Sequence, residues 1–134
     1  MKRYLPMALR LLLGLTFVAT SLIGIFNLAQ PPADYPPAAL AFAEALGRSG
    51  YFNPELMTVQ LVSGVALLLD LWTPLFLVVL VPVTVNILLF HVFLTPRLLF
   101  TVAAPGLLVF VLNVALLWIY RAHYRGLLTR RARP

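Results

Sequence analysis

Long hydrophobic runs, separated by short polar or proline-rich interruptions, dominate the pattern of this chain. The longest extends over residues 56–94 and contains one formal charge, Asp70, and one histidine, His91. Because about 20 apolar residues cross the hydrocarbon core of a bilayer, this stretch is too long for a single span. It is interrupted by a DLWTP segment, in which Thr73 is expected to cap a new helix and Pro74 to occupy its first position. The pattern therefore predicts two antiparallel transmembrane helices joined by a tight turn.

The same interpretation extends to the rest of the chain and predicts an all-α membrane protein that forms a single integral membrane domain over residues 1–134. We expect four transmembrane helices in an up-down bundle, at residues 5–29, 54–72, 74–94 and 97–122. Residues 37–47 also favour a helix, which is too short to cross the bilayer and is expected to lie in the outer interface. The alternative is that this short helix covers a pocket as a lid.

Prolines mark the other expected boundaries and one expected bend. Asn53 is predicted to cap the second span, followed by Pro54 in its first turn and by Glu55, which the positive end of the helix dipole favours. In the third span, Pro82 has no amide hydrogen to donate to the carbonyl of Val78, so the helix should bend there. A freed carbonyl within a membrane requires a partner from a neighbouring helix or a water.

Composition narrows the class of protein. The chain is 62% hydrophobic and 10% charged, outside the range of ordinary soluble domains. Its basic residues lie mainly at the two ends, including the tail at residues 121–134, so the positive-inside rule predicts cytoplasmic termini. The tail can bind anionic headgroups or dock a partner. There is no basic face with aromatic or polar readers, which argues against nucleic-acid binding.

Small residues recur at helical spacing in several of the predicted spans. In lipid, such positions allow close approach of neighbouring helices. The residues predicted to serve helix packing in this way are Gly14, Ser21, Gly24, Ser63, Gly64 and Gly106.

Four polar residues are predicted to reach the outer half of the bundle: Asn27, Gln60, Asn86 and His91. Uncharged polar groups at membrane depth are expected to face the bundle and find partners. One reading is a hydrogen-bonded network that only ties the helices together. The other is a pocket for the polar end of a lipid-like molecule such as a quinone. Asn86 and His91 are five residues apart, about 140° around a helix, so they are not expected to share a face.

The sequence offers no catalytic set. It contains no cysteine, which excludes disulfides and thiolate metal sites, and its two histidines, His91 and His123, are too far apart in the chain to predict a metal site. No nucleophile–base pair and no glycine-rich phosphate loop is recognisable, and no paired charges are expected within the spans. We therefore predict no independent catalysis. The sequence assigns no cofactor, although a quinone would fit.

Several segments, taken together in order, resemble the DoxX family of small bacterial inner-membrane proteins. They are RLLLGLTF (10–17), SGYF (49–52), QLVSGVALLL (60–69), VNILLFHVFLTP (85–96) and LLWIYRAHYRGLL (116–128). The resemblance implies a four-helix bundle in the bacterial inner membrane and similarity to a membrane subunit of thiosulfate:quinone oxidoreductase. Many members have a glutamate where this chain has Gln60, which puts a proton-handling role at that position in doubt.

Three functions remain open from the sequence. The first is a helper or membrane subunit that binds a quinone- or lipid-like molecule in the outer half of the bundle. The second is a subunit of a quinone-linked oxidoreductase acting on a small sulfur compound, and the third is a small transporter or channel. The predicted partners are the lipid bilayer and either another membrane protein or further copies of the chain.

Overall fold

The structure is a computed structural model that describes residues 4–31, 33–98 and 106–126. Over these residues the chain is helical and has no β-strand. The α-helices are α1 (Tyr4–Ile25), α2 (Pro37–Arg48), α3 (Phe52–Leu68), α4 (Thr73–Leu94) and α5 (Gly106–Ile119). Two short 3-10 helices, η1 (Pro96–Leu98) and η2 (Arg121–Tyr124), follow α4 and α5.

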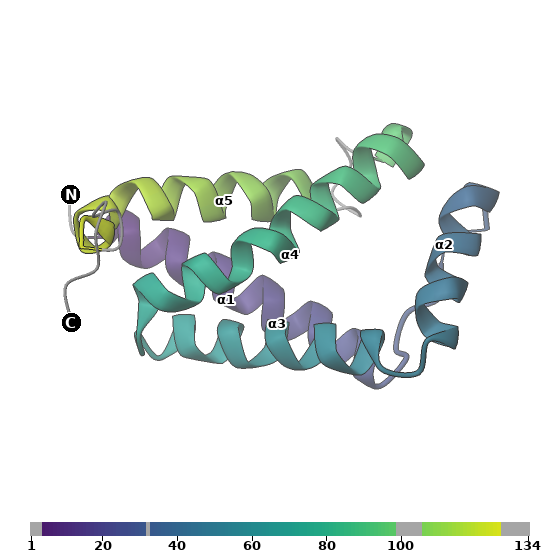
Figure 1. Cartoon of the computed structure of the whole chain (residues 1–134), viewed down its shortest axis with the longest axis horizontal. Helices are drawn as coiled ribbons and strands as arrows, with labels where there is room; N and C mark the ends of the chain where they lie inside the picture. The colour runs from purple at the N-terminus through teal and green to yellow at the C-terminus, as the bar shows by residue number, and fades with distance from the viewer. Residues whose placement is uncertain (1–3, 32, 99–105, 127–134) are drawn as a thin grey trace.

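The long helices run back and forth along one axis (Figure 1). Helix α1 packs on α3 and α5, and α4 packs on the same two helices, so each of the four touches two others. The start of α1, the turn between α3 and α4 and the end of α5 lie at one end of the molecule, which we call the closed end. At the other end α4 diverges from α3, and α2 lies across the space beside them (Figure 1). We call this the open end.

The helix limits differ from the expected spans mainly at their ends. Helix α1 stops at Ile25, before the predicted end of the first span, and α3 is residues 52–68, whereas the second span is predicted at 54–72. Helices α2 and α4 begin and end within one residue of the ranges predicted for them. For the fourth span, the described helix is Gly106–Ile119, and residues 99–105 lie outside the described part of the chain.

Two predicted helix caps are wrong. Thr73 is itself the first residue of α4, and its hydroxyl donates to the Asp70 carboxylate (2.8 Å) rather than capping the helix. Asn53 lies inside α3, which begins one residue earlier, and the amide of Phe52 instead donates to the Ser49 hydroxyl at 3.2 Å. In both cases a polar side chain three residues before the first helical residue, Asp70 or Ser49, accepts a hydrogen bond from that residue.

The core lies toward the closed end. It consists of apolar side chains from all four long helices: Leu13, Phe17, Leu67, Leu77, Leu80, Val109, Leu112 and Leu116. Glycines let α1 and α3 approach closely there, because a Cβ atom built at Gly64 would lie 2.9 Å from the carbonyl oxygen of Gly14. Such a contact between backbones is the packing that small residues permit in membrane helices.

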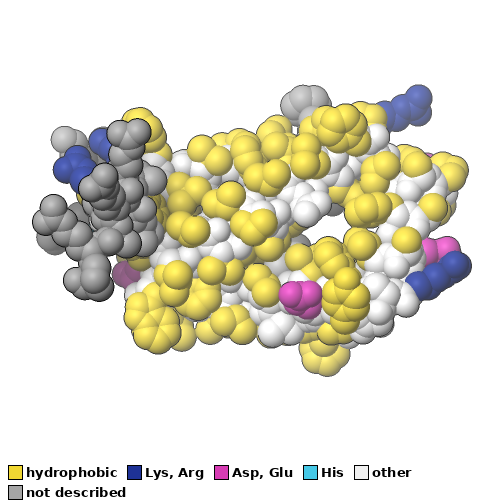
Figure 2. Space-filling model, in the orientation of Figure 1, with side chains coloured by type: hydrophobic (Ala, Val, Ile, Leu, Met, Phe, Trp, Pro, Cys, Tyr) yellow, Lys and Arg dark blue, Asp and Glu magenta, His cyan; other side chains and the backbone are white. Residues whose placement is uncertain are grey.

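The outer surface carries many large hydrophobic side chains. Hydrophobic side chains cover most of the helix surface in the view of Figure 2, and the Lys and Arg side chains seen there lie near the two ends. Helices α1 and α4, each 22 residues long, are apolar and long enough to cross a bilayer. The described part of α5 is apolar but shorter, and α3 has 17 residues.

Candidate functional site

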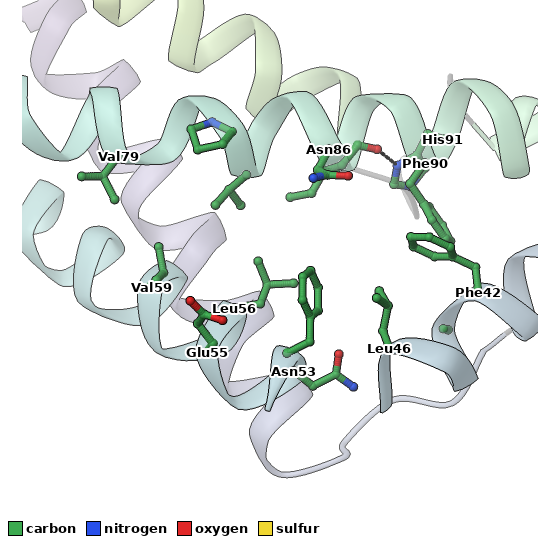
Figure 3. A pocket seen from close by; sticks show the side chains of 15 residues that line it. Phe42, Leu46, Asn53, Glu55, Leu56, Val59, Val79, Asn86, Phe90 and His91 are labelled. Atoms are coloured by element: carbon green, nitrogen blue, oxygen red, sulfur yellow. Dashed lines mark hydrogen bonds between the residues drawn. The ribbon is translucent and has the colours of Figure 1, made fainter. Parts of the chain in front are cut away.

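A cavity of about 580 Å³ opens between α2, α3 and α4 at the open end (Figure 3). Most of its wall is apolar, and its polar side chains are Asn53 and Glu55 from α3 and Asn86 and His91 from α4. The remaining lining residues are Phe42, Ala43, Leu46, Phe52, Leu56, Val59, Val79, Pro82, Val83, Ile87 and Phe90. An apolar concavity of this size with a few polar groups has the usual character of a small-molecule site.

Helix α2 closes one side of the cavity through aromatic contacts with α4. The ring of Phe90 lies 5.8 Å from that of Phe42 on α2 and 6.4 Å from that of Tyr35, measured between centroids. Tyr35 belongs to the loop before α2, and partial burial raises the pKa of its hydroxyl above the ordinary value. Aromatic pairs of this kind add to simple area burial. Phe90 thus connects the short helix to the long one.

His91 is held in one orientation by its neighbours. Its Nδ1 lies 2.7 Å from the carbonyl oxygen of Ile87, one turn earlier in α4 (Figure 3). Gly106 at the start of α5 leaves room for the ring, because a Cβ atom built there would lie 2.5 Å from Nδ1. Phe90 packs edge-on against the same ring at 5.5 Å. Gly106, predicted as a helix-packing residue, therefore makes space for a side chain of the cavity.

Asn86 and His91 both line this cavity, although their spacing indicates different faces of the helix. The lining residues of α4 extend from Val79 to His91, and the cavity is wide enough to include both Asn86 and His91. Asn53 lines it as well, and in Figure 3 its amide extends from α3 toward the space between the helices. Sequence reasoning missed Asn53 and Glu55 as lining residues because the Asn-Pro-Glu pattern was explained fully as a helix start.

The other two predicted ligand-binding residues lie elsewhere. Gln60 is buried in α3, as are Ser63 and Gly64, and it does not line the cavity. Asn27 is exposed in the turn after α1, with a left-handed backbone (φ 50°). The four residues are therefore not brought together, and the cavity contains two of them.

The predicted packing residues lie mainly between α1 and α3. A Cβ atom at Gly24 would lie 2.6 Å from the sulfur of Met57, and Gly14 and Gly64 oppose each other as described above. Ser21 is fully buried and donates to the carbonyl of Phe17 at 2.6 Å. The glycines therefore allow close contact between the two helices at two levels, and the Ser21 bond lies within α1.

At the closed end, one ion pair joins α1 to the turn between α3 and α4. Arg10 of α1 is buried, and its Nη1 forms an ion pair with Oδ1 of Asp70 in the turn between α3 and α4. The hydrogen bond from Thr73, together with the nearby Arg10, lowers the pKa of the Asp70 carboxyl below its ordinary value. Asp70 and Trp72 both have left-handed backbones (φ 57° and 46°), so these contacts hold a tight turn. The expectation of no paired charges missed this pair, since Arg10 and Asp70 are far apart in sequence.

Two hydrogen bonds connect α5 and the segment after it to α4. Asn113, which is buried in α5, donates from Nδ2 to the carbonyl of Leu77 at 3.2 Å. Pro82 leaves the carbonyl of Val78 without its usual donor, and Leu77 is the residue before Val78. The hydrogen bond from Asn113 therefore lies next to the part of the α4 backbone that Pro82 weakens. Near the closed end, the hydroxyl of Tyr124 donates to the carbonyl of Pro74 at 2.9 Å.

The geometry suits the binding of an amphiphilic molecule. Within residues 4–31, 33–98 and 106–126 no group of three or more His, Cys, Asp or Glu side chains could hold a metal ion. The polar groups of the cavity are a carboxylate, two amides and an imidazole, spread around an apolar space. They can orient the polar end of a bound molecule by hydrogen bonds while the apolar wall encloses its body.

Long apolar helices, a hydrophobic outer surface and a cavity between helices together define a small helical membrane protein. Among protein families, the DoxX family matches residues 5–94, which is more than half of the chain. The chain belongs to the DoxX family. Comparison with curated proteins and with solved structures found no significant match.

Proposed function

We propose that this DoxX-family protein is a bacterial inner-membrane helper or membrane subunit that holds a quinone- or lipid-like molecule in the cavity between α2, α3 and α4. The observation that carries the proposal is the cavity itself, about 580 Å³ in volume, with an apolar wall and polar groups on two helices. Asn86 and His91, which the sequence singles out, both contribute to it. Membership of the DoxX family supports the membrane setting.

The proposed topology has four spans, formed by α1, α3, α4 and α5, with both termini in the cytoplasm and α2 in the outer interface. Helix α2 then covers the cavity from the outer side, and the ligand lies in the outer half of the bilayer. The chain has no cysteine, so single cysteines report this orientation directly. A membrane-impermeant thiol reagent should label Ser49→Cys in intact cells and Ala122→Cys only after permeabilisation. The opposite labelling would reverse the orientation.

Filling the cavity tests the binding function. Ala43 lines the cavity from α2, whereas Ala41 is exposed on the same helix and does not. Mild detergent extraction followed by mass spectrometry should find a lipid-like molecule with the unmodified protein and with Ala41→Phe. Ala43→Phe should lose most of it, because the added ring occupies the space. Equal retention by the two variants, or no retained molecule in any sample, would contradict the proposal.

A second candidate is a subunit of a quinone-linked oxidoreductase that acts on a small sulfur compound. The family match is the observation that favours it, because DoxX proteins often serve in quinone oxidoreductases. In that case a partner protein supplies the redox chemistry and this chain supplies the membrane site. Quinone reduction that depends on both thiosulfate and the presence of this chain in membrane vesicles would support it. Quinone binding without donor-dependent reduction would leave the helper role.

A further inference from the structure

The polar side chains of the cavity differ in whether they can donate or accept hydrogen bonds. His91 has the most clearly defined role. Its Nδ1 lies 2.7 Å from the carbonyl oxygen of Ile87, and a carbonyl oxygen can only accept a hydrogen bond. Nδ1 therefore carries the ring proton and donates it to the helix backbone. In a neutral imidazole the other nitrogen, Nε2, is then an acceptor. The backbone of α4 thus fixes the tautomer of this side chain.

The acceptor Nε2 is available to a ligand. His91 makes no other hydrogen bond within the described residues, and Nε2 is absent from the buried polar atoms that lack a partner there, so it is accessible. The ring that carries it lines the cavity (Figure 3). Gly106 and Phe90 pack against the ring and oppose its rotation away from this position.

The other described side chains that line the cavity include hydrogen-bond acceptors, but none of them is a donor only. Glu55 is a carboxylate, which accepts, and the amides of Asn53 and Asn86 can do either. No lysine, arginine, tryptophan or tyrosine is among the described lining residues. A head group that only accepts would leave Nε2 without a partner, whereas one that carries a hydroxyl satisfies it. An unpaired acceptor in a desolvated site is costly.

We infer that the cavity selects an amphiphile with a hydroxylated aromatic head group, a phenol or hydroquinone, whose hydroxyl donates to Nε2 of His91. The aromatic character follows from the phenylalanine rings of the wall, Phe42, Phe52 and Phe90, which suit a flat ring. The inference rests on the proposed binding function and adds to it the chemical class and hydrogen-bonding state of the ligand.

A pair of matched probes tests this selectivity. 1-Naphthol and 1-methoxynaphthalene share a ring system, but only the first has a hydroxyl hydrogen. Equilibrium dialysis against the full chain in nanodiscs, corrected for partition into empty nanodiscs, should give roughly three- to tenfold tighter binding of 1-naphthol, the range of one net hydrogen bond. His91→Phe should reduce this ratio to about one, because the ring is kept and the acceptor is lost. His123→Phe, at the closed end, should leave the ratio unchanged.

The outcomes separate the two proposals. Equal binding of both probes to the unmodified protein, or a preference that persists in His91→Phe, overturns the inference while the binding function stands. Binding of neither probe overturns both. A second measurement does not depend on the folding of a His91 variant. In histidine-labelled His123→Phe protein, His91 is the single remaining imidazole, and nitrogen-15 NMR observes it directly. The proton should be on Nδ1, and 1-naphthol should shift the Nε2 resonance; a proton on Nε2 would overturn the inference.

Discussion

The closed and open ends of the molecule use the same two helices, α3 and α4, in opposite ways. At the closed end Arg10 forms an ion pair with Asp70 and Asn113 donates to the carbonyl of Leu77, while Nε of Arg10 is buried without a hydrogen-bond partner among the described residues. At the open end Asn86 lines a cavity and has no hydrogen-bond partner within the described residues. The two asparagines thus have the same chemistry and different surroundings. A polar side chain in a membrane helix is a candidate for function where the fold leaves it without a partner.

The largest expected difference between the ends comes from adding one methyl group to a glycine. In Gly64→Ala the new Cβ would lie 2.9 Å from the Gly14 carbonyl oxygen and 3.0 Å from the amide nitrogen of Val18, so backbone must shift. We expect the free energy of unfolding to fall by about 3 kcal/mol, the upper part of the range for overpacking. SDS titration in mixed micelles measures it.

Gly47→Ala is the control at the open end. The nearest atom to its Cβ would be Nδ2 of Asn53 at 3.7 Å, an ordinary contact. Because alanine favours a helix more than glycine does, this change should be neutral or stabilise the protein by up to about 1 kcal/mol. An equal loss of stability in both variants would show that the ends do not differ in packing.

The ion pair at the closed end gives the next largest effect. Asp70→Asn keeps a residue type that tolerates the left-handed backbone, but removes the charge that faces buried Arg10. The unfolding free energy should fall by about 1 kcal/mol, because Arg10 is buried but the Asp70 side chain is 62% exposed and solvent screens the pair. Glu44→Gln is the control, because the Glu44–Arg48 pair is exposed and worth little. Equal effects would mean that burial of Arg10 does not matter.

The same pair predicts a pH dependence. Since the pKa of Asp70 is lower in the folded protein than its ordinary value, the stabilisation is complete above that ordinary value, about pH 4. It should be lost as the pH falls through the lower folded pKa. The difference in unfolding free energy between the unmodified protein and Asp70→Asn should therefore shrink below about pH 4. A difference that stays constant at acidic pH would show that the carboxylate charge is not responsible.

Sequence reasoning succeeded where a signal is local. The apolar runs and prolines located the regions of α1, α2, α3 and α4, and family membership followed from segments spread along the chain. The predicted helix caps failed because the Thr73 hydroxyl bonds to Asp70 and because α3 begins at Phe52, one residue before Asn53. A depth estimate from position along a helix also cannot give the direction of a side chain. For this reason the predicted depth groups Gln60 with Asn86, whereas only Asn86 lines the cavity.

Replacing Gln60 should change the unfolding free energy less than the substitutions above, and whether it raises or lowers this energy is informative. It is buried, and within the described residues it makes no hydrogen bond. Replacing such a group by an apolar side chain of similar size is neutral or favourable. Gln60→Leu should therefore change the unfolding free energy by less than about 0.5 kcal/mol and leave binding to the cavity unchanged. A loss of 1 kcal/mol or more would indicate that the amide has a partner, such as a buried water.

The most direct test of the difference between the ends compares Asn86→Leu with Asn113→Leu. Both remove an amide from a membrane helix, one at the cavity and one in the packed core. Asn86→Leu should weaken 1-naphthol binding about three- to tenfold and leave the unfolding free energy unchanged. Asn113→Leu should lower the unfolding free energy by about 1 kcal/mol, because the bond to Leu77 is lost, and leave binding unchanged. If the two variants weaken binding equally, or if Asn86→Leu destabilises the protein while binding persists, the open end is not a binding site.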